Sequence, residues 1–167
     1  PNTTLFQPSS MNQKSCYSEK SVSLRDWERK GWITKHKTSP QEIEELFRIV
    51  DRDLSDCQAE DLSSDWRLNI AYNAALQSAK AALAAAGYRA SREAHHFRMI
   101  QSLRFTLELK EFLVDKLDQF RKKRNISDYE RAGLVSEGEV KEALSLAGRL
   151  KKQVEKWIRD NYPHLLA

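Results

Sequence analysis

The distribution of proline is the feature that most constrains what this chain can fold into. No proline occurs from Gln41 to Tyr162, because the four prolines of the chain are Pro1, Pro8, Pro40 and Pro163. Proline disrupts helix interiors, so a long segment without it favours helices. No stretch shows strand-like alternation of useful length. The sequence therefore predicts an all-α protein, an antiparallel bundle of four to five helices with a short N-terminal helical arm.

Helix start signals divide the proline-free segment. The first is a capping box in which Ser39 accepts from a free backbone N–H and Glu42 reaches back, with proline at the first helical position. The apolar residues behind it have the spacing of one buried helix face; they are Ile43, Leu46, Phe47, Val50 and Leu54. This pattern predicts an amphipathic helix that packs on the rest of the bundle.

The middle of the chain predicts a central helix followed by a long helical region. The central helix starts at Ser63 or Ser64, is rich in alanine, and ends at Gly87, which suits a left-handed C-terminal cap. Its small side chains allow close packing of neighbouring helices. The next helical region covers residues 91–123, but its apolar phase slips near Phe105–Leu109. We therefore expect a bend there or a break into two helices.

The two ends of the folded part carry their own signals. Ser136 and Glu139 repeat the capping-box pattern before a final apolar stripe. Near the N-terminus, the segment "LRDWERKGWI" predicts a short helix that ends at Gly31. Trp27 and Trp32 in this segment are expected to anchor the arm on the bundle, because large aromatic side chains dominate burial.

Composition indicates a globular protein with one folded domain. The chain has 167 residues and a formal charge of +4, which is weak support for nucleic acid unless the charges cluster. Residues 39–164 are expected to form the bundle, and residues 1–38 a leader and a tryptophan-containing arm. Two cysteines without metal-ligand spacing favour a reducing cytoplasm. The sequence predicts no metal site, no cofactor and no membrane association.

Two other groups of polar residues favour structural roles. His95 and His96 are adjacent, so on a helix they point in different directions and cannot jointly bind one metal ion. We expect them near a helix start with one ring turned inward. Asp51, Asp53 and Asp56 are expected on a solvated helix face, because no partner motif accompanies them.

The segment "RKKRNISDYE" combines several functional groups where a helical pattern ends. Arg121 and Arg124 are three residues apart, so their guanidinium groups can grip one phosphate. Asn125 can end the helix and present an amide to a base or sugar, and Asp128 and Tyr129 can join the cluster. The alternative is that these cations only complement the dipole of a helix C-terminus.

Several segments, taken in order, resemble the HEPN domain family, which is named for its occurrence in higher eukaryotes and prokaryotes as a nucleotide-binding domain. The segments are "DWRLNIAYNAALQSAKAALAAAGYRA", "HHFRMIQSL", "LDQFRKKRNISDYE" and the capped last helix. The resemblance implies a small helical bundle that often forms a homodimer. It also implies RNA binding, metal-independent ribonuclease activity, or a toxin-antitoxin or defence role beside a nucleotidyltransferase partner.

One part of the family pattern is absent. Ribonucleases of the family carry an arginine, often followed by a polar residue, and then a histidine after four to six intervening residues. Arg124 and Asn125 match the first half, but the histidine positions hold Tyr129, Glu130 and Arg131. Tyrosine is a poor proton shuttle at neutral pH.

Three functional classes follow from this mismatch. The first is a non-catalytic module that binds RNA or a nucleotide through Arg121, Arg124, Asn125 and Tyr129, or docks a nucleotidyltransferase. The second is a divergent ribonuclease in which Asp128 or Tyr129 acts on the ribose 2′-hydroxyl and the two arginines stabilise the phosphate charge. The third is a structural homodimeric interaction protein.

Overall fold

The computed structural model describes residues 22–127 and 133–166, and within them the all-α prediction is confirmed. The helices are α1 (Leu24–Arg29), α2 (Pro40–Asp56), α3 (Ser64–Ala85), α4 (His95–Thr106), α5 (Glu111–Ser127) and α6 (Glu137–Asn161), followed by a short 3-10 turn at Pro163–Leu165. Two three-residue strands, β1 (Ile33–Lys35) and β2 (Tyr88–Ala90), complete the described elements.

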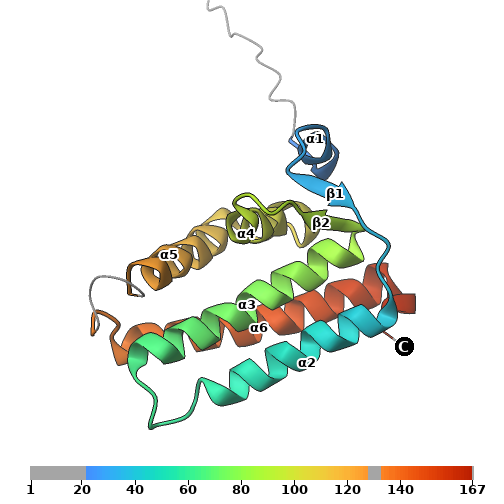
Figure 1. Ribbon diagram of the computed structural model, residues 1–167. Helices are drawn as coiled ribbons and strands as arrows, with labels where there is room; N and C mark the ends of the chain where they lie inside the picture. Colours follow the sequence, from blue (N-terminus) through green and yellow to red (C-terminus); the bar gives the residue numbers. More distant parts are fainter. Residues whose placement is uncertain (1–21, 128–132, 167) are drawn as a thin grey trace, which may run out of the picture.

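Helix α3 is the centre of the bundle. It packs against α2 and α6 on one side and against α4 and α5 on the other (Figure 1). Eight of its alanines are buried, and the large buried side chains Leu68, Tyr72 and Leu83 fill the spaces between them. A helix that is apolar on nearly every side belongs in a core, and its alanines let the neighbouring helices approach closely.

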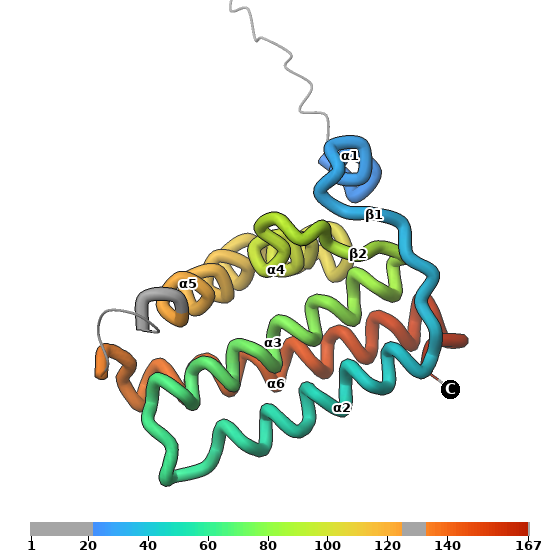
Figure 2. Tube along the Cα trace, in the orientation of Figure 1, coloured from blue at the N-terminus to red at the C-terminus, as the bar shows by residue number. Residues whose placement is uncertain are grey.

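The directions of the helices depend on how the chain returns between α3 and α6. Helix α2 runs antiparallel to α3, whereas α3 and α6 run in the same direction (Figure 2). Glu137 at the start of α6 accepts hydrogen bonds from Ser64 and Arg67 at the start of α3, at 2.6 and 2.7 Å. The α4–α5 pair carries the chain back between them, so both long helices can start at the same end.

The predicted break in the third helical region is confirmed at Leu107–Lys110, between α4 and α5. Glu108 has a positive φ of 52°, a conformation that non-glycine residues adopt rarely. The N–H of Leu109 donates to the carbonyl of Leu103 at 3.1 Å, which closes the end of α4. The slip in apolar phase therefore marks a real turn, and α5 folds back beside α4.

The antiparallel pair of strands is the element that the sequence pattern did not predict. Ile33 pairs with Ala90, and Lys35 pairs with Tyr88. Three residues are too few to show an alternating pattern, so only the structure reveals this pairing. The strands join the arm to the segment after α3, where Gly87 takes the expected left-handed conformation with φ of 89°.

The predicted arm helix and its anchors are found in the structure. Helix α1 has a full capping box at Ser23, and Gly31 has φ of 72° just beyond it. Trp27 is buried, and its ring meets the rings of Trp32 and Phe105 edge-on at 5.8 and 5.2 Å. Edge-to-face packing of this kind adds to the burial of apolar area, so the arm is fixed to α4.

The two predicted capping boxes have different outcomes. At α6 the prediction is confirmed, because Ser136 caps the backbone of Glu139 and the Glu139 carboxylate accepts from the N–H of Ser136 at 2.9 Å. At α2 only half of it holds. Ser39 accepts from the N–H of Glu42, but the Glu42 carboxylate turns to Nε2 of His36 at 2.8 Å. A partner brought in by β1 therefore replaces the local one.

Candidate functional site

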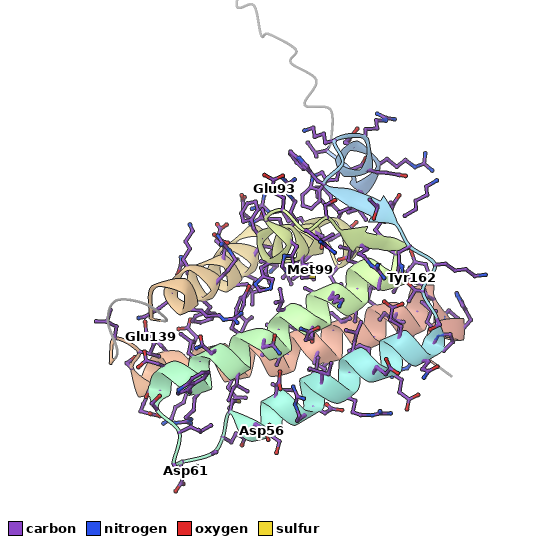
Figure 3. The ribbon with its side chains drawn as sticks, in the orientation of Figure 1. Asp56, Asp61, Glu93, Met99, Glu139 and Tyr162 are labelled. Carbon is purple, nitrogen blue, oxygen red and sulfur yellow. The ribbon has the colours of Figure 1, made fainter. Side chains whose placement is uncertain are left out.

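Arg121, Lys122 and Lys123 near the end of α5 form ion pairs. Arg121 donates from Nε to Oδ1 of Asp118 at 2.7 Å, and Nζ of Lys122 lies 3.2 Å from the other oxygen of the same carboxylate. Burial would raise the pKa of Asp118, but hydrogen bonds and charges from both cations outweigh it and lower the pKa. Lys123 pairs with Glu139 of α6, which Figure 3 labels near the end of α5.

Arg124 is directed toward α3. Its guanidinium carbon lies 5.5 Å from the centre of the Tyr72 ring, within the range of a cation–π contact. Tyr72 is only 1% exposed, and burial raises its pKa to about 12, although the charges of Arg124 and Arg121 act in the opposite direction. Among the described residues, the Tyr72 hydroxyl has no hydrogen-bond partner. A buried hydroxyl of this kind ordinarily bonds a water molecule or a ligand.

Arg124 lines a cleft of about 390 Å³ beside α3. The cleft is bounded by α3, the start of α4, β2, the end of α5 and the segment that leads into α2. Its floor is largely apolar and includes Met99, which Figure 3 labels between α4 and α3. The polar and charged lining residues are His36, Glu42, Asn73, Gln77, Lys80, Arg89, His95, His96 and Arg124.

The two adjacent histidines stand at one side of this cleft. Their rings meet edge-on at 4.3 Å; His95 is exposed, and His96 is half-buried 6.5 Å from the Tyr72 ring. This arrangement confirms the expectation of one ring turned inward. Burial lowers the pKa of His96 to about 4, helped by His95, Arg124 and Arg121. His96 is therefore neutral at pH 7 and can accept or donate a hydrogen bond.

The start of α4 positions these histidines without a side-chain cap. Ala94 occupies the cap position in a left-handed conformation, with φ of 50° and no capping hydrogen bond. Nδ1 of His95 lies 3.1 Å from the carbonyl of Arg92. Positive φ at a non-glycine residue costs free energy, and such residues gather at functional sites.

Positive charge dominates the cleft. Lys80, Arg89 and Arg124 line it, and in the described part of the chain neither Lys80 nor Arg89 forms an ion pair with a carboxylate. Among the described lining residues the carboxylate is that of Glu42, which is already hydrogen-bonded to His36. A cavity with apolar walls and an excess of cations attracts anions, because field lines concentrate there.

The buried acid Asp53 corrects one sequence-based expectation. It is 5% exposed rather than solvated, since it turns toward α3 instead of following its neighbours into solvent. Oδ1 accepts two hydrogen bonds from Arg52, and Oδ2 accepts one from Nδ2 of Asn73 at 2.6 Å. A buried carboxylate needs such partners to offset the loss of water. Asp51 and Asp56 are exposed, as expected.

The remaining candidates of the sequence motif lie at or beyond the edge of the described residues. The backbone of Asn125 belongs to α5, but its side chain is outside the described part. Asp128 and Tyr129 lie outside it altogether. Where the structure describes the chain, no group of three or more histidine, cysteine or acidic side chains is arranged to hold a metal ion.

Sequence reasoning missed that His96, Lys80 and Gln77 share a cleft with Arg124. A trace of this site is present on the alanine-rich helix, where Asn73, Gln77 and Lys80 are four and three residues apart. Such spacing places polar side chains on one face of an otherwise apolar helix. A polar stripe on an otherwise apolar helix indicates a face that borders a cavity or solvent.

Comparison with known proteins identifies one family. The model of the HEPN domain matches residues 43–157, which extend from the first turn of α2 to the last turns of α6. The match includes the cleft-lining parts of α3, α4 and α5. No curated protein matches the chain. None of the helices in the described ranges is both long enough and apolar enough for a membrane span.

Proposed function

The chain belongs to the HEPN domain family, whose members have roles related to nucleotides or RNA, and from this premise we propose that it binds the phosphate of an RNA or nucleotide in the cleft beside α3. The observation that carries the proposal is the convergence of Arg124, Lys80 and Arg89 with two histidines on one cavity. These cations come from three different elements, so capping of one helix end does not explain them.

Arg124 supplies the central phosphate contact. A guanidinium group can offer two parallel N–H donors to phosphate oxygens. The contact of Arg124 with the Tyr72 ring already restricts its side chain, so less conformational entropy is lost when a ligand binds. Neutral His96 adds one donor or acceptor beside it. Lys80, which is exposed on the same face of α3, adds charge at the rim. Arg121 is predicted to contribute too, in competition with its pairing to Asp118.

Binding measured as a function of salt tests the proposal. Fluorescence anisotropy with a short single-stranded RNA and calorimetry with nucleoside monophosphates give the affinities. We expect affinity to fall as salt rises, since each neutralised phosphate releases counterions. Arg124→Ala is expected to weaken binding and reduce the salt slope by about 0.7 for the lost contact on a single strand. Binding that is absent, or that is unaffected by Arg124→Ala, would overturn the proposal.

The position of His96 favours ribonuclease activity as a second candidate function. His96 is a candidate for the role of the histidine missing after Arg124, because both side chains line one cleft and the charge of Arg124 helps to lower the pKa of His96. Neutral His96 can accept the proton of a ribose 2′-hydroxyl as the 2′-oxygen attacks phosphorus. The bond to the 5′-oxygen then breaks as that oxygen takes a proton from solvent, leaving a 2′,3′-cyclic phosphate, while Arg124 stabilises the added charge.

Product analysis distinguishes binding from cleavage. Purified protein is incubated with RNA in a chelating buffer, and the products are examined for cyclic phosphate ends. If the chain is a nuclease, His96→Gln should lower the rate about 10² to 10⁴ fold while RNA affinity stays within a few fold. Asp128→Asn and Tyr129→Phe test the sequence-based alternative in the same assay. RNA that is bound but never cut would remove this second function and leave the first.

The assembly is the last part of the proposal. We propose a homodimer with the end of α5 near its two-fold axis, and a nucleotidyltransferase partner in a toxin-antitoxin or defence system. The family supports this assembly, and the 40% exposed Phe97 beside Arg121 offers an apolar contact for a second subunit. Light scattering at micromolar concentration tests the dimer; a mass of 19.4 kDa at all concentrations would contradict it. Co-purification with the product of a neighbouring gene tests the partner.

A further inference from the structure

We propose that Gln77 recognises the base of the bound ligand and that this base is adenine, with Asn73 and Asp53 acting as positioning residues. The inference rests on the proposed phosphate-binding function and adds a specificity to it. It starts from a chain of hydrogen bonds that leads from a buried charge on α2, across α3, to the wall of the cleft.

The chain of hydrogen bonds begins at Asp53, which is 5% exposed. Its Oδ2 accepts from Nδ2 of Asn73 at 2.6 Å, and Oδ1 of Asn73 accepts from Nε2 of Gln77 at 3.3 Å. A carboxylate only accepts hydrogen bonds, so the amide of Asn73 must present its nitrogen to Asp53 and its oxygen to Gln77. The carboxamide of Gln77 is thereby oriented with its nitrogen toward Asn73.

The orientation leaves a defined pair of groups for a ligand. Gln77 is half-buried and lines the cleft, and no hydrogen bond among the described residues uses its Oε1. Gln77 therefore keeps its Oε1 acceptor and one N–H donor for a ligand. An apolar floor of Leu76, Leu83 and Met99 lies beside them. A cavity with apolar walls and a few oriented polar groups is the usual form of a ligand site.

Gln77 and Arg124 line the same cleft at different levels of α3. Gln77 follows Tyr72 by five residues, which corresponds to about 7.5 Å along the helix axis. Arg124 stacks on Tyr72, so the proposed phosphate contact and the proposed base contact lie at successive levels of α3. A ligand with its phosphate at Arg124 can therefore place its base near Gln77.

The chemistry of the carboxamide indicates adenine. A carboxamide forms two hydrogen bonds with adenine, accepting from the N6 amino group and donating to N7. In hypoxanthine an oxygen replaces that amino group and would face Oε1 of Gln77, so that two acceptors oppose each other. Adenosine and inosine monophosphates share their phosphate and ribose, and they differ at this position and in the protonation of N1. The pair is therefore a sensitive probe of the proposed contact.

The experiment measures the affinities of adenosine 5′-monophosphate and inosine 5′-monophosphate by calorimetry on the full chain. We expect the adenosine compound to bind the wild-type protein about tenfold more tightly, as one good bidentate contact discriminates bases by roughly that factor or more. Gln77→Leu should reduce the ratio of the two affinities to near one. The same ratio measured with short oligoadenylate and oligoinosinate shows whether RNA or a free nucleotide is the better ligand.

Positioning by Asn73 has its own readout. Asn73→Ala removes the acceptor that orients Gln77, so we expect it to lower the adenosine-to-inosine ratio severalfold while the inosine affinity changes less than twofold. If Asn73 only supported the fold, Asn73→Ala would weaken the binding of both nucleotides equally. Lys122→Ala, on the outer face of α5, is the control and should leave the ratio unchanged.

Failure of this inference is distinguishable from failure of the phosphate site. Equal affinities in the wild-type protein, or a ratio that survives Gln77→Leu, would overturn the role of Gln77 while binding that depends on Arg124 still supports the phosphate site. If neither nucleotide nor oligonucleotide binds, the phosphate site fails and the base contact fails with it. Circular dichroism on each variant confirms that the helical fold is retained.

Discussion

Positive charge gathers in two regions, the segment Arg121–Lys123 of α5 and the cleft beside α3, but the two regions differ in what surrounds the charge. In the α5 segment, Arg121, Lys122 and Lys123 are consecutive in the sequence, and each meets a carboxylate of Asp118 or Glu139. In the cleft the cations come from separate elements and the lining carboxylate is occupied by His36. A run of cations in a sequence therefore does not measure the charge that a ligand would meet.

The largest expected effect is a difference in RNA affinity between variants of two cations that lie in the same turn of α5. Arg124→Ala should weaken binding of single-stranded RNA about tenfold or more, because a hydrogen bond to a charged group contributes ~1.5–3 kcal/mol. Lys122→Ala removes the same charge from the outer face and should change affinity less than twofold. Anisotropy titrations at one fixed salt concentration compare the two variants. Equal losses would mean that net charge, and not the cleft, determines binding.

Arg121 should give an intermediate effect. Its side chain is 20% exposed and held by Asp118, so a phosphate must compete with a carboxylate for it. We expect Arg121→Ala to weaken RNA binding two- to fivefold, less than Arg124→Ala, through the nearby positive charge that is lost. The double variant Arg121→Ala with Asp118→Asn serves as control, because it removes the carboxylate that competes with phosphate together with the arginine. A loss as large as that of Arg124→Ala would place both arginines on the phosphate.

The third expectation concerns pH and His96. Its pKa is lowered from 6.5 to about 4 in the folded protein, mainly by burial, so the unfolded chain binds more protons between these values. The neutral ring thus supports stability fully above pH 6.5, and this contribution is lost as the pH falls toward 4. Partial exposure of the ring reduces the effect. In urea unfolding at several pH values, His96→Gln should flatten the decline, and His164→Gln is the control.

The smallest effect belongs to the ion pair of Lys123 with Glu139. Both side chains are about one-third exposed, and pairs of this kind contribute ~0.2–1 kcal/mol to the free energy of unfolding. Lys123→Gln should lower the thermal midpoint slightly and leave RNA affinity unchanged. Calorimetric scans of wild type and variant measure the difference. A clear loss of RNA binding would show that the segment Arg121–Lys123 of α5 contacts the ligand after all.

The sequence predicted those parts of the fold that local patterns determine. Ser63 and Ser136 are helix caps because a serine oxygen satisfies backbone N–H groups within three residues, and Gly87 ends α3 because it tolerates positive φ. The turn at Glu108 was visible as a shift in apolar phase. These features depend on neighbours along the chain, so one segment contains all the information they require.

The features that could not be predicted involve partners far apart in the sequence. Glu42 turns to His36 rather than to its own helix cap, and Asp53 is buried because Asn73 lies opposite it. His96 and Arg124 are also far apart in the sequence, since they belong to α4 and α5, yet they share a cleft. A motif search along one helix looks for the histidine near the arginine in sequence, whereas chemistry requires only proximity in space.

The shortness of the strand pair affects the local stability of one wall of the cleft. His36 reaches the cleft from the arm, and three residue pairs between β1 and β2, together with the N–H of His36 on the carbonyl of Gly87, join it to the bundle. So short a ladder can open locally while the helices stay folded and Trp27 stays packed on α4. Amide hydrogen exchange would then be faster in β1 than in α3. The wall of the cleft that contains His36 would be the part of the site that opens transiently.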